Sequence, residues 1–224
     1  MKRISLLLSG GLFFLILILM SCNQDDIVYS CNEEVNQWAK ENLDGLRTMS
    51  REDWKGLSDN KKIAAYRAFN QEQRITFWKD KFAEVKMLDW SAKEISHIEK
   101  LEAFVSQHPD FFTDNGLTDE QANELDLFFY QWQKDAYEEF GWTKKVCIAI
   151  AGTGESVEKE CGEIIIKSSA IPTPDEPVKE KDYCHCNLTY DFCTGNTVCE
   201  DDPCQYSSIG CGWFLSSSCN GLCK

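Results

Sequence analysis

The cysteines are the residues in this chain with the clearest chemical potential. Eight of the twelve lie within residues 183–224, less than a fifth of the chain. They are Cys184, Cys186, Cys193, Cys199, Cys204, Cys211, Cys219 and Cys223. A segment this short cannot bury enough apolar surface to offset its chain entropy, so covalent or metal cross-links must hold its shape.

Disulfides suit these cysteines better than zinc does. Structural zinc sites use two pairs of Cys or His ligands at matched spacing, usually two to four residues apart within each pair. Here Cys184 and Cys186 are separated only by His185, and the remaining gaps are irregular. We therefore expect four disulfides in residues 183–224, with no metal and no cofactor. The spacing leaves their pairing open.

The start of the chain indicates export. Two basic residues precede an apolar run over residues 4–20, which is the pattern of a secretory signal. The run ends in Leu-Met-Ser-Cys, the pattern at which bacterial lipoproteins are cleaved and lipidated. We expect residues 1–21 to be a lipoprotein signal peptide and Cys22 to carry lipid, followed by a tether over residues 22–30. An uncleaved membrane anchor is the alternative.

The net charge of the chain excludes some classes of binding partner. The formal net charge is −14, with 37 Asp and Glu against 23 Lys and Arg. This balance argues against nucleic acid and against anionic lipid headgroups as the main partner. Residues 23–26, Asn-Gln-Asp-Asp, resemble a short acidic signal that sends some lipoproteins to the cell surface. A solvated tether explains these four residues equally well. We expect a location in the outer membrane or at the cell surface, with membrane attachment through the N-terminal lipid.

Residues 31–142 carry a helical pattern with a single proline, Pro109. Apolar residues at spacings of three and four predict five helices, near residues 32–47, 58–69, 75–85, 91–108 and 118–141. Ser91 and Thr118 each begin a capping-box pattern. The predicted fold is mainly α, a bundle of about five helices followed by a β-hairpin, a linker and a small disulfide-rich module.

Residues 143–167 are expected to form that hairpin. The β-branched runs 146–151 and 164–166 lie on either side of a polar stretch that contains glycine. Cys147 and Cys161 flank the stretch and form the natural disulfide pair. Cys31 is then either an odd thiol or a member of a shuffled pairing. Residues 168–182 hold three of the five prolines and predict an extended linker that separates the last module from the helices.

The sequence shows no catalytic set. His97 and His108 have no paired partner, and no nucleophile, base and oxyanion site come together. The six tryptophans of the helical region could line a ligand groove, but large aromatic residues in a helical pattern more often belong to the core. These are Trp38, Trp54, Trp78, Trp90, Trp132 and Trp142. We do not expect an enzyme.

Residues 183–224 contain a Cys-x-Cys opening, an aromatic-rich spacer, the block Ile-Gly-Cys-Gly-Trp at 209–213, and Cys-Asn-Gly at 219–221. In this order of features the tail resembles the bacteriocin fulvocin C-related family. It implies an antibacterial module that a surface lipoprotein displays or releases against an unknown envelope target or receptor on another cell. The alternative is a surface lipoprotein that uses the module for ligand binding or adhesion, without toxicity.

Aromatic side chains are the candidates for target binding. A module of this size cannot hide all of its rings, so we expect several to be exposed and able to contact a membrane interface or a receptor. The candidates are Tyr190, Phe192, Tyr206, Trp213 and Phe214. Four acidic residues against one lysine in the module favour a specific target over general attack on anionic membranes.

Overall fold

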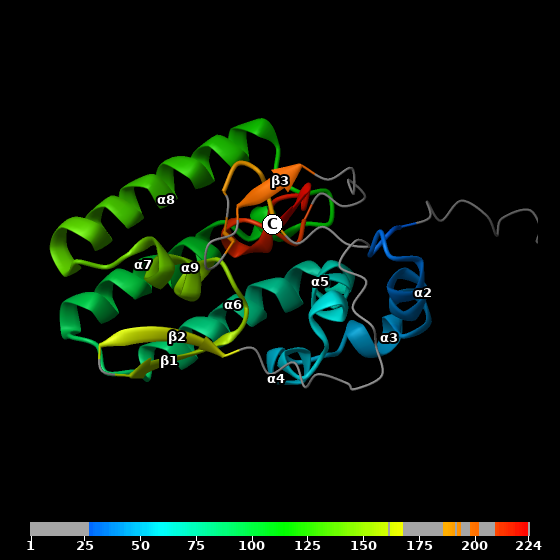
Figure 1. The fold of residues 1–224 in the computed structure, drawn as a ribbon, viewed down its shortest axis with the longest axis horizontal. Helices are drawn as coiled ribbons and strands as arrows, with labels where there is room; N and C mark the ends of the chain where they lie inside the picture. Colours follow the sequence, from blue (N-terminus) through cyan, green and yellow to red (C-terminus); the bar gives the residue numbers. More distant parts are fainter. Residues whose placement is uncertain are drawn as a thin grey trace, which may run out of the picture.

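The computed structural model describes residues 27–160, 162–167, 186–190, 192–193, 198–201 and 209–223. The fold is mainly helical, as the sequence predicts, with a two-stranded hairpin and a cysteine-rich C-terminal region (Figure 1). In chain order the elements are α2 (Glu33–Glu41), α3 (Leu43–Leu46), α4 (Arg51–Lys55), α5 (Asp59–Ala68), α6 (Gln71–Lys86), α7 (Ala92–Gln107), η1 (Pro109–Phe112), α8 (Asp119–Phe140), α9 (Lys144–Ala151), β1 (Ser156–Glu160), β2 (Glu163–Lys167), β3 (Cys199–Asp201), η2 (Trp213–Leu215) and β4 (Gly221–Cys223).

The helix ends follow the local sequence closely. The capping boxes expected at Ser91 and Thr118 are both formed, and they begin α7 and α8. Gly141 ends α8 in the left-handed conformation, with φ of 65°, which only glycine adopts easily. The first predicted helix is divided at Asn42 into α2 and α3. Local signals therefore account for most of the helical boundaries.

The long helix α6 lies at the centre of the molecule. It packs against α7 and against β1, and α7 packs against α8. In Figure 1 the hairpin β1–β2 lies along the edge opposite α8, and the red C-terminal residues lie among the helices. The expectation that tryptophans build the core is confirmed for five of the six; these are Trp54, Trp78, Trp90, Trp132 and Trp142.

The prediction of a strand over residues 146–151 is wrong. This segment belongs to helix α9, whose N-cap Thr143 accepts a hydrogen bond from the backbone N–H of Val146. Residues 147–151 are all buried, so they show no alternation between a buried and an exposed face. A short, fully apolar run cannot be assigned to a strand or a helix by its periodicity. The hairpin itself is present but begins at Ser156, where Ser156 pairs with Lys167.

Candidate functional site: the cystine-linked tail within the helical core

Three disulfides cross-link the described part of the tail. They join Cys186 to Cys199, Cys193 to Cys223 and Cys211 to Cys219. The disulfide expectation is thus confirmed for six of the eight tail cysteines. Cys184 and Cys204 lie outside the described residues, as does the proposed lipidation site Cys22.

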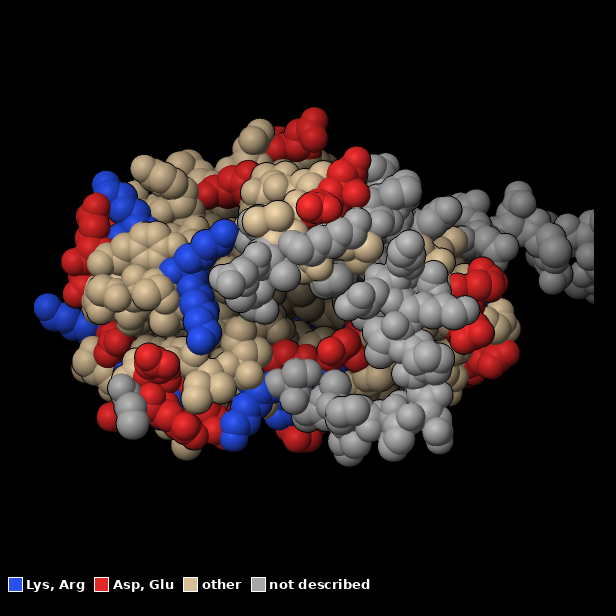
Figure 2. Space-filling model, in the orientation of Figure 1, with Lys and Arg blue, Asp and Glu red and all other residues tan. Residues whose placement is uncertain are grey.

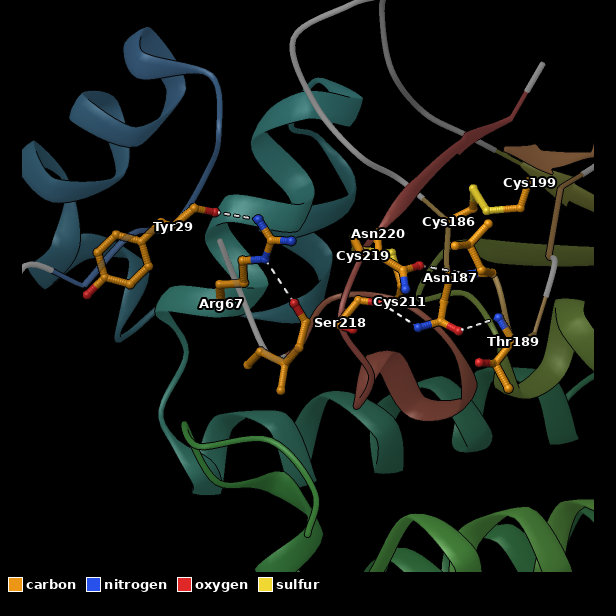
Figure 3. The surroundings of a disulfide bond; sticks show 12 residues. Tyr29, Arg67, Cys186, Asn187, Thr189, Cys199, Cys211, Ser218, Cys219 and Asn220 are labelled. Carbon is orange, nitrogen blue, oxygen red and sulfur yellow. Dashed lines mark hydrogen bonds between the residues drawn. A yellow bond between two sulfur atoms is a disulfide. The ribbon is translucent and has the colours of Figure 1, made fainter. Parts of the chain in front are cut away.

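The disulfides lie close to one another. The antiparallel pairing of β3 with β4 sets Cys199 opposite Cys223, and the sulfur atoms of Cys186, Cys193 and Cys199 lie within 4.8 Å of one another. These sulfurs are already bonded in disulfides. These two disulfides therefore form a compact covalent cluster. The Cys186–Cys199 bond is drawn in Figure 3.

The predicted pair Cys147–Cys161 does not form. Cys147 lies in α9 as a free thiol with no exposed surface, and Cys161 is outside the described ranges. The pairing assumed that Cys147 sat on a strand of the hairpin, whereas α9 turns it into the helical core. Burial raises the pKa of the Cys147 thiol to about 12, so it remains protonated and unreactive at neutral pH.

Cys31 is not an odd thiol. It is disulfide-bonded, and none of the other described cysteines is its partner. The sequence left two possibilities for Cys31, an odd thiol or a member of a shuffled disulfide pairing. The structure supports the second.

The loop closed by Cys211 and Cys219 carries its aromatic tip into the helical core. Phe214 has no exposed surface, and its ring centroid lies 5.3 Å from that of Trp78 and 5.0 Å from that of Phe129. Trp213 stacks on Phe129 at 4.2 Å with an interplanar angle of 9°. Rings from the tail and from the helices thus form one continuous cluster.

Hydrogen bonds fix the backbone of the same tip. The carbonyl oxygen of Phe214 accepts from the Tyr66 hydroxyl at 2.9 Å and from the indole N–H of Trp78 at 3.0 Å. Burial raises the pKa of Tyr66 to about 12, so its hydroxyl keeps the proton that it donates. Both donors are buried side chains of the helical domain. Without the loop, the buried Tyr66 hydroxyl and Trp78 N–H would lose the Phe214 carbonyl oxygen as their acceptor.

The tip adopts an unfavourable backbone conformation to make these contacts. Phe214 and Leu215 have φ angles of 53° and 52°, in the left-handed region. Each such residue costs about 1–2 kcal/mol when it carries a side chain. Full burial of a single Phe side chain is worth about 1.5–3 kcal/mol, before its contacts with other rings are counted. Packing therefore outweighs the strain at Phe214.

Two of the candidate target-binding residues are not available for binding. Trp213 and Phe214 are 4% and 0% exposed, so the expectation that they face solvent is wrong. It treated the tail as a separate module, whereas the helices supply the apolar core that the tail lacks. Tyr190 and Phe192 are half-buried, and Tyr206 is outside the described residues.

Tyr190 and Phe192 sit where the tail meets the helices. The Tyr190 hydroxyl donates to Asp126 Oδ1 on α8 at 2.7 Å, and Phe192 packs edge-on against Trp213 at 4.5 Å. Burial, followed by the hydrogen bond with Asp126, raises the pKa of Tyr190. Their remaining exposed surface is the part of the predicted aromatic set that can meet a ligand.

Arg67 on α5 joins the N-terminal segment to the start of the last described segment of the tail. Its Nη1 donates to the carbonyl oxygen of Tyr29 and its Nε to that of Ile209, each at 2.9 Å (Figure 3). In the adjacent turn, Asn187 donates to the carbonyl oxygen of Ser218 and accepts from the backbone N–H of Thr189. The tail is thus attached to the helical domain through polar contacts as well as through its aromatic tip.

A buried charged cluster beneath β1 was missed from the sequence. Lys62 Nζ lies 2.6 Å from Glu155 Oε1, and Lys81 donates to the backbone carbonyl of Glu155. Arg51 donates to Glu84 Oε2 at 2.6 Å and to the carbonyl oxygen of Gly154 at 2.9 Å. These contacts tie the segment between α9 and β1 to α4, α5 and α6.

The charges in this cluster are strongly perturbed. Burial, followed by the charge of Arg51, lowers the pKa of Lys81 to about 7. Burial acts against the charge of Glu84, but the hydrogen bond and charge of Arg51 lower its pKa to about 2. One signal was available in the sequence: Lys81 falls between Trp78, Phe82 and Val85 on the apolar stripe of α6, where a lysine must be buried.

The two histidines of the helical region have structural surroundings. His97 is buried and stacks on Trp132 with an interplanar angle of 14°, and its Nε2 lies 2.9 Å from the carbonyl oxygen of Trp132. Burial, followed by the charge of Lys100, lowers its pKa. His108 stacks on Phe104. Both rings are parts of the aromatic packing around α7.

Comparisons with models of known protein families, with curated proteins and with solved structures give no match for this chain. Among the described residues, no helix is both long enough and apolar enough to cross a membrane.

Proposed function

We propose that this protein is an exported, lipid-anchored envelope protein that acts as an intact unit and uses its cystine-linked face to bind a partner or ligand. The insertion of the loop 211–219 into the helical core carries this proposal, because it makes the tail a structural part of the domain. The disulfides support an oxidising location outside the cytoplasm. The lipoprotein pattern that ends at Cys22 supports the anchor.

Release of the tail as a free peptide would be costly. It would expose Trp213 and Phe214 and leave a cavity beside Trp78 and Phe129. Removal of a single large aromatic side chain from a core costs about 3–5 kcal/mol. The total stability of a domain is only about 5–15 kcal/mol, so loss of both rings would threaten the helical domain. Display of the tail within the fold is therefore favoured over its release.

Antibacterial action by the displayed tail is the second candidate. It is supported by the resemblance of residues 183–224 to the fulvocin C-related family and by the three disulfides of the described tail. In this version the intact protein inhibits another cell on contact. The two candidates place the tail in the same position and differ only in whether binding is toxic.

Cell binding and growth inhibition separate the candidates. Oxidised protein from residue 23 onward, labelled on surface lysines, is added to related bacteria, with its reduced and alkylated form as the control. Binding by the oxidised form without growth inhibition supports the leading proposal, and binding with inhibition supports the second. Absence of binding by the oxidised form contradicts both.

A second experiment tests whether the tail stays in place. A specific protease site is inserted within residues 168–182, in a Cys31→Ser background so that the Cys31 disulfide cannot hold the fragments together. After cleavage, the two fragments are expected to co-elute in native gel filtration because of the contacts of Trp213 and Phe214. Dissociation into a folded helical fragment and a free peptide would contradict an integrated tail and restore the release hypothesis.

A further inference from the structure

The outward face of α8 carries large apolar side chains. Leu127, Tyr130 and Tyr137 are 69%, 66% and 40% exposed, whereas Leu125, Phe129 and Trp132 on the opposite side of the helix are buried. Together with Lys134 they follow one another at spacings of three, four and three residues. That spacing places them on one side of a helix and is the pattern by which two helices pack along a seam.

The same helix is strongly acidic. The α8 sequence contains seven Asp and Glu residues and a single basic residue, Lys134. Glu138 and Glu139 lie in its last turn, which has no basic residue, although the carbonyl end of a helix favours positive charge. In Figure 2, red acidic side chains border tan surface along the upper edge of the molecule, where α8 runs. The acids of the last turn therefore oppose the helix dipole in the protein alone.

Apolar exposure and misplaced acidic charge are both unfavourable for the protein alone. Features that violate local stability rules occur mainly where function requires them. A single exposed leucine or tyrosine would need no explanation, but here three share a face. Asp135 and Glu124 have partners in Lys100 and His108, whereas Glu138 and Glu139 in the last turn make no ion pair with the described residues. These two independent observations point to a ligand that supplies both apolar contact and positive charge.

The cystine-linked tail extends this face. The hydrogen bond from Tyr190 to Asp126 anchors the turn 187–190 beside the N-terminal half of α8. Leu127 follows Asp126 on the helix, and Leu188, which is 42% exposed, belongs to the turn that this bond attaches to α8. The tail thus contributes an exposed apolar side chain to the turn that it bonds to this helix.

We propose that this face of α8 docks a cationic amphipathic helix of a partner protein. This inference rests on the proposed binding function and names its surface and partner class. The apolar side of the partner helix would lie along Leu127, Tyr130 and Tyr137, and its flanking Lys or Arg residues would meet the acids of α8. The ten helical steps from Leu127 to Tyr137 rise about 15 Å, which corresponds to about three turns of the partner.

The negative charge of α8 favours a basic helix over a second copy of the chain or an anionic bilayer as the ligand of this face. A second copy of the chain would bring another acidic α8 against the first, in a protein whose net charge is already −14. An anionic bilayer would be repelled for the same reason. A basic helix removes the repulsion among the acids of α8 and covers its exposed side chains in one event.

Titration with model peptides tests this inference. The probe is a synthetic amphipathic peptide of Leu and Lys, and a peptide of the same pattern with Glu in place of Lys is its control. We expect the Leu/Lys peptide to bind the oxidised full chain, with an affinity that falls as salt increases, and the Leu/Glu peptide not to bind. Tyr130→Ser with Tyr137→Ser should weaken binding at least tenfold, while the control Met87→Ser, at a residue 86% exposed in the turn before α7, should leave it unchanged.

Each contrary result is informative. Equal weakening by Met87→Ser, or no weakening by the tyrosine variants, would reduce the binding to general attraction between opposite charges and overturn the inference. A dimer that Tyr130→Ser dissociates in sedimentation would replace the partner helix with a second copy. If cell binding by the oxidised protein survives Tyr130→Ser with Tyr137→Ser, the proposed function stands but this surface does not serve it.

Discussion

Replacement of Phe214 by alanine tests how far the tail belongs to the core. Its ring lies among five aromatic rings of the helical domain, with centroid distances of 5.0–6.1 Å; these are Trp78, Phe82, Phe104, Phe112 and Phe129. A fully buried Phe→Ala change costs about 3–5 kcal/mol of unfolding free energy. We expect a value in this range, since rings on several helices cannot all collapse into the space.

The unusual backbone at this position gives a second, sharper expectation. Glycine in a regular element is normally less stable than alanine, but Phe214 has φ of 53°, where a Cβ atom is unfavourable. Phe214→Gly removes the ring and this strain together, whereas Phe214→Ala removes only the ring. The glycine variant should therefore be the more stable of the two, by up to about 1–2 kcal/mol.

Urea denaturation of the oxidised chain from residue 23, followed by tryptophan fluorescence, measures these differences. Leu188→Ala is the matched control, because Leu188 is also in the tail but is 42% exposed, and it should change the unfolding free energy by less than about 1 kcal/mol. A loss below about 1 kcal/mol for Phe214→Ala would refute the packed tip. Such a result would mean that the tail is an independent module.

Three further expectations concern charge and sulfur. The pKa of Lys81 falls from 10.5 to about 7 on folding, so between these values the unfolded chain binds more protons than the folded one. The site therefore opposes folding most strongly below pH 7, and this penalty shrinks as pH rises toward 10.5. In urea melts at pH 6 to 9, the stability of the wild type relative to Lys81→Met should therefore rise with pH, and a flat difference would contradict the buried ammonium. Reduction of the disulfides should lower the thermal midpoint, since each typically contributes about 2–4 kcal/mol; an unchanged midpoint by circular dichroism would show that the helices do not depend on the linked tail. Cys147 should resist iodoacetamide in the native protein and react in denaturant, as judged by peptide mass, whereas rapid native labelling would show that α9 does not bury it.

The sequence was most informative where structure depends on neighbouring residues. The capping boxes at Ser91 and Thr118 and the apolar stripes of α6 to α8 are local patterns, and each predicted helix exists. The strand prediction for residues 146–151 was wrong because a helix buried on all sides has the same run of apolar residues as a buried strand. The packing around this segment, and not its amino-acid composition, determined that it is a helix.

The candidate site could be predicted only in part, because it depends on distant contacts. The cysteine density correctly indicated disulfides, but the hydrogen bond from Tyr66 to Phe214 joins residues separated by 148 positions. No local pattern shows that a tail rich in aromatic residues will enter a helical core. One sequence feature did indicate additional burial: Lys81 stands on an apolar stripe, which suggests that the helices bury more than their own apolar residues.

If the chain is anchored at Cys22 as proposed, the two hydrogen bonds of Arg67 limit how far the tail reaches from the membrane. Arg67 holds the carbonyl oxygens of Tyr29 and Ile209 on one guanidinium, so the cystine-linked loop begins beside the N-terminal segment. With lipid on Cys22, only six residues lie between the anchor and Tyr29, and the seven steps of a fully extended chain span about 25 Å. The linked tail would then work close to its own bilayer, and a partner would have to come to the membrane surface to meet it.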